Sequence, residues 1–201
     1  MRNPENIAEL RELDIDWIGM IFYSKSPRCV EQSLEQLSFN GLQRVGVFVD
    51  ESLTSIRDKT FRYGLNIIQL HGSETPEICS QVKRLGVKVI KAISVSSKAD
   101  LLNVSSFEGV IDYLLLDTKS DVKGGSGQKF DWSILESYTA DIPFLISGGI
   151  GSEDTQAIAQ IDHPKLAGVD LNSRFEISPG LKDVVLVKSF VEELRKESHE
   201  I

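Results

Sequence analysis

One carboxylate in the sequence stands at the end of an apolar run and ahead of a glycine-rich segment. Asp117 follows three consecutive leucines at residues 114–116. The glycine-rich segment consists of Gly124, Gly125, Ser126 and Gly127. A carboxyl group in this position can act as a general acid or a general base, and glycines let the backbone close over a small ligand. The alternative is that Asp117 caps the next helix or orders the loop.

Two further segments have the composition of anion-binding loops. In the first segment, Ser147 precedes Gly148 and Gly149, and a helix is predicted to begin at Ser152. Glycines between a strand and a helix expose backbone N–H groups to an anion such as phosphate. The second segment contains Asp170, Asn172 and Ser173. A tight turn without a ligand is the alternative in both places.

Other polar side chains also follow or interrupt apolar runs. Arg28 can hold a carboxylate through two hydrogen bonds, or can be a solvated arginine ahead of a helix. His71 is a candidate for proton exchange, although a histidine in such a place is more often a hydrogen-bonded wall residue. Lys91 lies inside an apolar run, where Schiff-base chemistry would need a partner that the sequence does not reveal. Asp131 is expected to cap a helix that begins at Trp132.

The elements that must position these residues are short apolar runs separated by helical patterns. The runs are residues 17–22, 44–49, 66–70, 88–93, 112–117, 142–146 and 167–171. Nearly continuous apolar runs are typical of strands buried on both faces, and repeated βα units predict a parallel sheet with right-handed crossovers. The pattern gives seven strands and eight helices. An open doubly wound sheet could use seven strands, whereas a (β/α)8 TIM barrel needs eight.

Bulk composition excludes several classes of protein. A length of 201 residues with 41% hydrophobic residues favours one domain with a substantial core. The net charge of −8 argues against general binding of nucleic acid or of an anionic membrane. Two cysteines without a Cys-x-x-Cys pair argue against a disulfide framework and fit a reducing, cytoplasmic location. No apolar run approaches the roughly 18 residues of a membrane span, and no signal peptide is visible.

Several motifs follow one another in a fixed order along the chain. They are Phe22 with Ser26-Pro27-Arg28, Val45-Gly46-Val47-Phe48-Val49, Gln69-Leu70-His71-Gly72, Leu116-Asp117, Gly124-Gly125-Ser126-Gly127 with Phe130-Asp131-Trp132, Ser147-Gly148-Gly149, Val169-Asp170 and Pro179-Gly180-x-Lys182-Asp183. In this order they resemble the phosphoribosylanthranilate isomerase family of tryptophan biosynthesis. The resemblance extends over nearly the whole chain.

The resemblance implies a single (β/α)8-barrel domain over residues 1–201 that binds a phosphorylated small molecule and needs no cofactor or metal. The implied reaction is the Amadori rearrangement of N-(5-phosphoribosyl)anthranilate to 1-(2-carboxyphenylamino)-1-deoxyribulose 5-phosphate. An acid protonates the ribose ring oxygen, the ring opens, and a base removes the C2 proton. The enolamine then collapses to the ketone. Members of the family are expected to be monomers, without nucleic-acid or membrane partners.

The family's site residues transfer to matching positions of this chain. The general acid corresponds to Asp117, and the substrate-binding arginine corresponds to Arg28. His71 and Asp170 are expected to contact or position the substrate. The phosphate loops match Gly148, Gly149, Asn172 and Ser173, and the active-site loop matches Gly124, Gly125, Ser126 and Gly127.

The chain departs from the family pattern in two places. Relatives begin with a strand that ends in Lys-[Ile/Val]-Cys-Gly, whose cysteine is the general base, and this chain starts just after that point. Cys29 stands where relatives have an aromatic residue and is not expected to replace the base, while Cys79 is expected in the core. Arg174 stands where relatives have glycine, and it could add a phosphate contact or close off a backbone approach.

The absent first strand leads to several expectations. Met1 is either an internal methionine of a longer protein or the start of a truncated relative that no longer catalyses. Strands 17–22 and 167–171 would then expose free edges, open an apolar groove into the core, and favour low stability, dimerisation or aggregation, unless another segment occupies the gap. Two alternative functions follow: a non-catalytic phosphate-binding barrel, or a different phosphosugar isomerase on the same scaffold.

Overall fold

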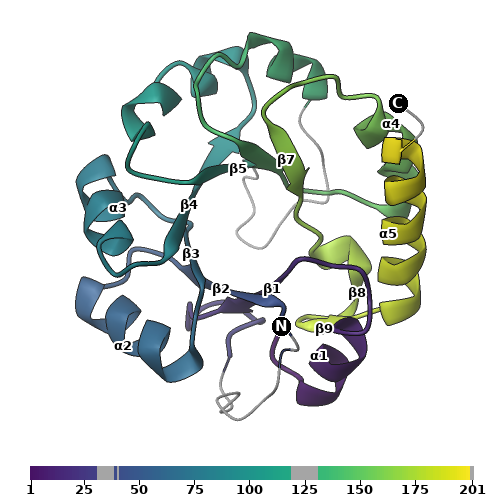
Figure 1. Cartoon of the computed structure of the whole chain (residues 1–201), viewed down its shortest axis with the longest axis horizontal. Coiled ribbons are helices and arrows are strands. Elements are labelled where there is room, and N and C mark those ends of the chain that lie inside the picture. The colour runs from purple at the N-terminus through teal and green to yellow at the C-terminus, as the bar shows by residue number, and fades with distance from the viewer. Residues whose placement is uncertain (31–38, 40, 119–130, 200–201) are drawn as a thin grey trace.

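The computed structural model describes residues 1–30, 39, 41–118 and 131–199, and within them seven strands form one parallel sheet. The strands are β1 (Trp17–Ile21), β2 (Gln43–Phe48), β3 (Ile67–Leu70), β4 (Lys88–Val95), β5 (Tyr113–Thr118), β6 (Phe144–Ile146) and β7 (Leu166–Val169). Each strand pairs with the next in chain order, and the sheet curls around a central axis with helices outside it (Figure 1). All seven predicted strands and the barrel architecture are confirmed. The strands pair in sequential order and the helices of the described residues lie only outside the curled sheet, which excludes an open doubly wound sheet.

Several predicted helices are short or 3-10 in the described residues, and the helix expected after Arg28 lies mostly outside them. The α-helices are α1 (Pro4–Leu10), α2 (Leu53–Tyr63), α3 (Pro76–Lys83), α4 (Thr155–Ala159) and α5 (Val184–His199). Turns of 3-10 helix occupy Lys98–Leu101, Val104–Phe107, Trp132–Ser137, Ser152–Asp154 and Ser173–Phe175. The helix expected at Ser152 therefore begins as a 3-10 turn, and the one expected at Trp132 remains 3-10 throughout. Short segments gain few of the cooperative turns that favour an α-helix, so 3-10 turns are common in them.

Apolar side chains fill both faces of the sheet, as the continuous apolar runs predict. All four residues of β3 are buried. The inner face carries a cluster inside the barrel: Val45, Ile67, Ile90, Ala92, Leu115 and Leu145, with Trp17, Val47 and Tyr113 packed against it. The rings of Trp17 and Tyr113 pack edge to face, with their centroids 5.2 Å apart. Each fully buried aliphatic side chain contributes roughly 1.5–3 kcal/mol, so this inner layer is a substantial part of the core.

The two outermost strands of the sheet do not pair with each other in the described part of the chain. Within the residues that the structure describes, β7 pairs only with β6, which agrees with the expected free edge. At β1 the expected alternative, in which another segment occupies the gap, is confirmed in part. Ile21 pairs with β2 on one edge and forms a parallel bridge with Cys29, which must therefore lie on the other edge. The α-amino group of Met1 also donates a hydrogen bond to the carbonyl of Gly19. The chain's own residues thus cover part of the β1 edge.

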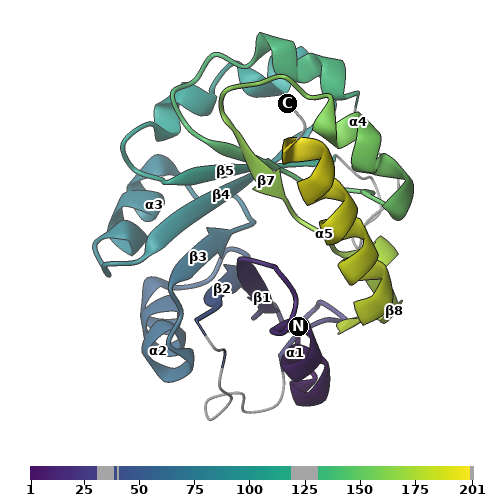
Figure 2. The ribbon, with the colours of Figure 1, turned by 45° about the vertical axis from the view of Figure 1, so that its right-hand side comes forward.

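A small antiparallel hairpin follows β7 and was not predicted. Its strands are β8 (Glu176–Ser178) and β9 (Leu181–Lys182). Asn6 of α1 binds both backbone groups of Lys182: its Oδ1 accepts from the Lys182 N–H at 2.7 Å, and its Nδ2 donates to the carbonyl at 3.0 Å. The hairpin lies beside α1 on the side of the molecule where β1 and β7 face each other (Figures 1 and 2).

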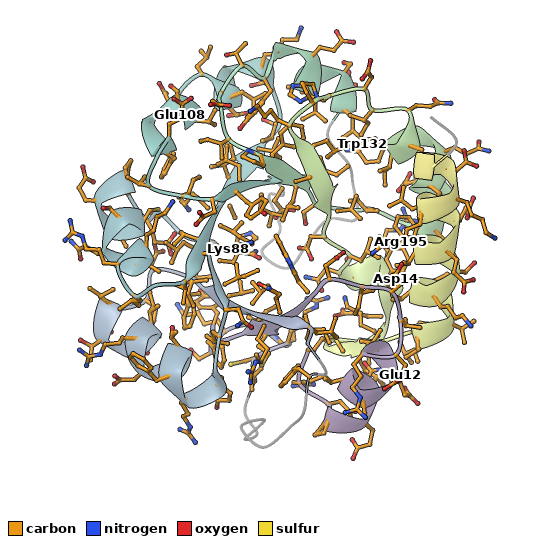
Figure 3. The ribbon with its side chains drawn as sticks, in the orientation of Figure 1. Glu12, Asp14, Lys88, Glu108, Trp132 and Arg195 are labelled. Atoms are coloured by element: carbon orange, nitrogen blue, oxygen red, sulfur yellow. The ribbon has the colours of Figure 1, made fainter. Side chains whose placement is uncertain are left out.

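Helix α5 is attached to the loop between α1 and β1 by charged side chains. Arg195 lies 2.8 Å from Asp14 and 3.3 Å from Asp16 (Figure 3). All three side chains are exposed, so these contacts orient the helix more than they stabilise it. Across the described residues, none of the helices combines the length and the apolar character required to cross a membrane.

Candidate active site

The candidate site residues lie where the strands of the parallel sheet end. His71 directly follows β3, and Asp117 is the second-last residue of β5. Ser147 follows β6, and Asp170 follows β7. Arg28 lies in the segment after β1. Because the carboxyl ends of parallel strands meet at one end of a barrel, these side chains share one face, the face that carries catalysis in such barrels.

His71 and Asp117 form the central pair of the site. Nε2 of His71 lies 3.4 Å from Oδ2 of Asp117, and its Nδ1 lies 2.9 Å from the side-chain nitrogen of Gln69. The amide nitrogen of Gln69 can only donate, so Nδ1 accepts and the ring proton of a neutral His71 lies on Nε2, facing Asp117. The Asp117 side chain is 27% exposed, which leaves it open to a ligand. The sequence placed both residues in the site, and the structure brings them together.

Asp170 adds a second carboxylate to this face. Its Oδ2 accepts a hydrogen bond from the hydroxyl of Ser147 at 3.3 Å. Burial raises the pKa of Asp170 above its ordinary value, the charge of Lys182 opposes that effect, and the nearby Asp117 charge reinforces it. The charge of Asp117 is therefore close enough to influence the ionisation of Asp170.

The loop after β6 has the backbone of an anion-binding turn. Gly148 and Gly149 both have positive φ, at +85° and +69°. A Cβ on Gly148 would lie 2.6 Å from the backbone nitrogen of Thr118, so this position needs glycine for space as well as for conformation. Among the described residues, the amide groups of these two glycines have no hydrogen-bond partner. Two such donors side by side suit an anion.

The loop after β7 lies next to this turn. Lys182 donates from Nζ to the carbonyl of Asn172 at 2.9 Å, and Ser173 begins a 3-10 turn. Arg174 joins the two loops, because its Nη1 donates to the Gly149 carbonyl at 3.2 Å and lies 2.6 Å from a Glu153 carboxylate oxygen. The predicted phosphate residues therefore belong to neighbouring loops that Arg174 links together.

Arg28 is already bound to a carboxylate of the protein itself. Its Nε donates to both oxygens of Glu176 at 3.0 and 2.9 Å, and its Nη2 lies 2.7 Å from Oε2. Burial would raise the pKa of Glu176, but the Arg28 hydrogen bonds and the charges of Lys182 and Arg28 outweigh it and hold that pKa below its ordinary value. Glu176 was not among the residues predicted from the sequence. Its signal is an acid flanked by the apolar residues Phe175 and Ile177.

The remaining predicted residues have mixed outcomes. Gly124, Gly125, Ser126 and Gly127 lie outside the described residues. Asp131 accepts a hydrogen bond from the Ser133 N–H at 2.9 Å, which confirms its capping role. Cys79 is fully buried, as expected for a core residue, and burial raises the pKa of its thiol to about 11. Lys91 is buried in β4 and has a partner, Glu74, that the sequence did not reveal.

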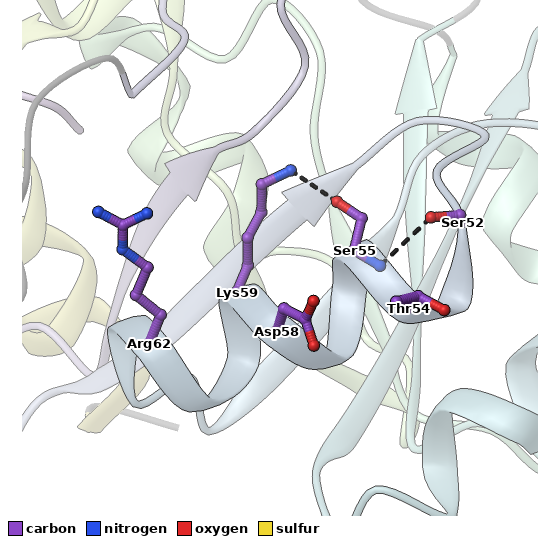
Figure 4. Close-up of a pocket in the computed structure, with 6 residues that line it drawn as sticks. All are labelled: Ser52, Thr54, Ser55, Asp58, Lys59 and Arg62. Atoms are coloured by element: carbon purple, nitrogen blue, oxygen red, sulfur yellow. Dashed lines mark hydrogen bonds between the residues drawn. The ribbon is translucent and has the colours of Figure 1, made fainter.

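Two hollows elsewhere on the surface offer no comparable chemistry. One, of about 390 Å³, runs along α2 and is lined by Ser52, Thr54, Ser55, Asp58, Lys59 and Arg62 (Figure 4). Its polar groups bind each other: Lys59 donates to the Ser55 hydroxyl at 2.9 Å, and Ser52 caps the helix. The other, of about 490 Å³, lies at the amino-terminal ends of β1 and β2. The described residues contain no group of three or more His, Cys, Asp or Glu side chains placed to hold a metal ion.

Comparison with known proteins agrees with this geometry. Residues 1–193 match the family model described as N-(5'-phosphoribosyl)anthranilate isomerase. An N-(5'-phosphoribosyl)anthranilate isomerase of Parabacteroides distasonis is 45% identical over 96% of this chain and 90% of its own. A solved phosphoribosyl anthranilate isomerase from Thermotoga maritima superimposes with a TM-score of 0.83 at 32% identity, over 98% of this chain and 96% of that one.

A further solved isomerase was determined in complex with reduced 1-(o-carboxyphenylamino)-1-deoxyribulose 5-phosphate. It has a TM-score of 0.79 at 30% identity and covers 98% of this chain and 95% of its own. The family model, the relatives and the solved structures all match nearly the full length of the chain. The chain therefore belongs to the N-(5'-phosphoribosyl)anthranilate isomerase family.

Proposed function

We propose that this protein rearranges N-(5'-phosphoribosyl)anthranilate to 1-(o-carboxyphenylamino)-1-deoxyribulose 5-phosphate in tryptophan biosynthesis. The observation that carries the proposal is the pairing of Asp117 with His71, at 3.4 Å, beside two loops with the backbone of an anion site. Family membership favours this activity over a different phosphosugar isomerase or a barrel that only binds phosphate.

Asp117 is proposed as the general acid that protonates the ribose ring oxygen. It lies at the open end of the barrel, and its side chain is accessible to a ligand. The Nε2–H of His71 orients one carboxylate oxygen and leaves the other to face the substrate. Such an arrangement fixes the direction of proton transfer, which contributes typically 10²- to 10⁴-fold to a rate.

The phosphate group is proposed to bind between the loops after β6 and β7. The backbone amides of Gly148 and Gly149 are available as donors, and Asn172 and Ser173 stand across from them in the neighbouring loop. Arg174 joins the two loops and adds positive charge at their junction. Backbone N–H groups and a guanidinium together suit a dianionic phosphate.

Arg28 is proposed to bind the carboxylate of the anthranilate ring, and Asp170 to position the sugar. Because Glu176 already contacts Arg28, a substrate carboxylate must share the guanidinium with it or displace it. The fork of five N–H donors on arginine allows such sharing. We further propose that residues 1–201 act as a single domain, as a monomer, in the cytoplasm, where both free cysteines would stay reduced.

The proposed function is tested by incubating the purified protein with N-(5'-phosphoribosyl)anthranilate and following the loss of anthranilate fluorescence. The expected result is turnover that is lost in the Asp117→Asn variant. Such turnover would also mean that a group within residues 1–201 removes the C2 proton in place of the family's cysteine. A separate binding measurement uses the reduced product analogue. Tight binding of that analogue without any turnover would overturn the enzymatic proposal and leave a phosphate-binding barrel.

A further inference from the structure

A buried ion pair between Lys91 and Glu74 lies beneath the candidate site. Nζ of Lys91, in β4, is 3.0 Å from Oε2 of Glu74, and the two side chains are only 4% and 2% exposed. Removing two charges from water is costly, and a well-packed apolar pair often stabilises a core as well or better. The pair therefore calls for an explanation beyond stability.

The ammonium group of Lys91 holds the backbone on both sides of His71. It donates to the carbonyl of Leu70 at 3.1 Å and to that of Gly72 at 2.7 Å. A further hydrogen bond reaches the carbonyl of Ala92 at 3.0 Å. Four oxygens, counting that of Glu74, surround a group with three protons. All three protons are bound by oxygens of the protein, and an ammonium group has no lone pair with which to attack a substrate. This argues against Schiff-base chemistry at Lys91.

Glu74 connects the same loop to the loop after β2. Its Oε1 accepts from the Asp50 N–H at 2.9 Å, and its Oε2 accepts from the Gly72 N–H at 2.8 Å. Asp50 in turn accepts from the Ser73 N–H at 2.6 Å and has the left-handed backbone, with φ of +49°. A Cβ on Gly72 would lie 2.7 Å from the Asp50 nitrogen. The two loops are therefore locked together by Glu74.

His71 lies at the centre of these contacts. Its own N–H donates to the carbonyl of Phe48 at 2.8 Å, so its backbone is held through residues 70, 71 and 72 at once. Its ring then has only side-chain rotation left, and Gln69 restricts that rotation from one side. The direction in which the ring meets Asp117 is thus set by the backbone beneath it.

We propose that Lys91 and Glu74 form a positioning pair that holds His71 against Asp117. The pair touches neither substrate nor reacting atoms and acts only through the backbone of residues 70–72. Its catalytic consequence rests on the proposed isomerase function, because it concerns the orientation of the proposed acid. Misplacing a catalytic group by about 1 Å can cost on the order of 10²-fold in rate.

The test uses the double variant Lys91→Met/Glu74→Gln, in which no buried charge is left without its partner. The single variant Glu74→Gln is a second perturbation, which leaves the buried Lys91 without its counter-charge and is expected to lower stability more. Nuclear magnetic resonance of ¹⁵N-histidine reports on His71 directly, since the chain has three histidines and the His71→Asn variant identifies the signal. We expect the His71 ring signals to move in both variants of the pair and those of His163 to stay.

The second readout is kcat, measured for the double change at Lys91 and Glu74 with His71 present and with His71 replaced by Asn. With His71 present, the double variant should lower kcat by about 10- to 10²-fold with little change in KM. In a His71→Asn background the same double change should lower kcat by less than about twofold, because there is no imidazole left to position. Independent, multiplying losses would overturn the proposal.

A matched control removes a buried hydrogen bond far from this pair. Tyr138→Phe deletes the 2.7 Å bond from the Tyr138 hydroxyl to the Ile142 carbonyl, and should lower stability without moving the His71 signals. Unmoved His71 signals in the Lys91 and Glu74 variants would overturn the positioning role whether or not the protein turns over. Absent turnover with moved signals would instead count against the proposed function alone.

Discussion

Arg28 and Glu176 lie 148 residues apart in the sequence, and their side chains form a multi-point ion pair with its shortest contact at 2.7 Å. Arg28 follows β1, and Glu176 begins the hairpin after β7. The pair therefore connects the two ends of the sheet, which do not hydrogen-bond to each other as strands in the described residues. The Asn6 side chain makes a second connection between these ends through its two hydrogen bonds to the backbone of Lys182.

The first prediction concerns the stability that this ion pair supplies. Replacing Glu176 with Gln leaves Arg28 without its buried counter-charge and removes one of the two carboxylates that interact with Lys182. We expect the free energy of unfolding to fall by about 3–5 kcal/mol. Urea denaturation at pH 7 measures the loss. Asp58→Asn is the control, because its pair with Arg57 is exposed and should contribute less than about 1 kcal/mol. Equal effects of the two substitutions would contradict a structural role for Glu176.

The second prediction concerns pH. The folded protein holds the pKa of Glu176 below its ordinary value of 4.5, so this carboxyl binds its proton less tightly in the folded state than in the unfolded chain. Its stabilisation is therefore present above about pH 4.5 and disappears as the pH falls through the lowered folded pKa. The difference in unfolding free energy between the wild type and Glu176→Gln should shrink from pH 7 to pH 3. A constant difference would show that the charge of Glu176 is not responsible.

The third prediction tests the acid. Asp117→Asn keeps the size of the side chain and its contact with His71 but cannot supply the proton. We expect kcat to fall by about 10²-fold or more, with binding of the reduced product analogue nearly unchanged. The loss of anthranilate fluorescence measures kcat, and isothermal titration calorimetry measures binding of the analogue. Turnover close to that of the wild type would remove Asp117 from the acid role.

The fourth prediction tests the anion loop. Gly148→Ala places a Cβ at positive φ and 2.6 Å from the Thr118 nitrogen, so the turn must shift. We expect weaker binding of the product analogue and a loss of at least about 1 kcal/mol in stability. Gly86→Ala is the matched control, since its φ of +80° carries the same backbone cost but a Cβ there meets nothing within 4 Å. If the control weakened binding equally, the phosphate site would lie elsewhere.

The sequence predicted the elements of this fold well because each strand carries a local signal. Continuous apolar runs such as Leu114–Leu116 identify strands buried on both faces, and the polar residue after each run marks the end that bears the site. The pairing of His71 with Asp117 follows from that common end. The resemblance to a family then supplied the proposed roles.

The remaining features depend on contacts between distant residues. Nothing near Lys91 in the sequence indicates Glu74, and nothing near Arg28 indicates Glu176, because tertiary packing alone brings each pair together. The hairpin of β8 and β9 is too short to show a periodic pattern. The bridge between Ile21 and Cys29 likewise covers the β1 edge without any local signature.

The order of the strands also has a consequence for how the molecule folds. Each strand pairs with its neighbour in the chain, so the sheet can grow by one unit at a time with short loop closures. Its two ends are held together by contacts between residues far apart in the sequence, among them Arg28 with Glu176 and Asn6 with Lys182, across 148 and 176 residues. Because closures that long are entropically costly, we expect them to form last. Interactions formed after the main barrier chiefly slow unfolding. The lifetime of the folded barrel, more than the speed of its formation, therefore depends on these two side-chain contacts.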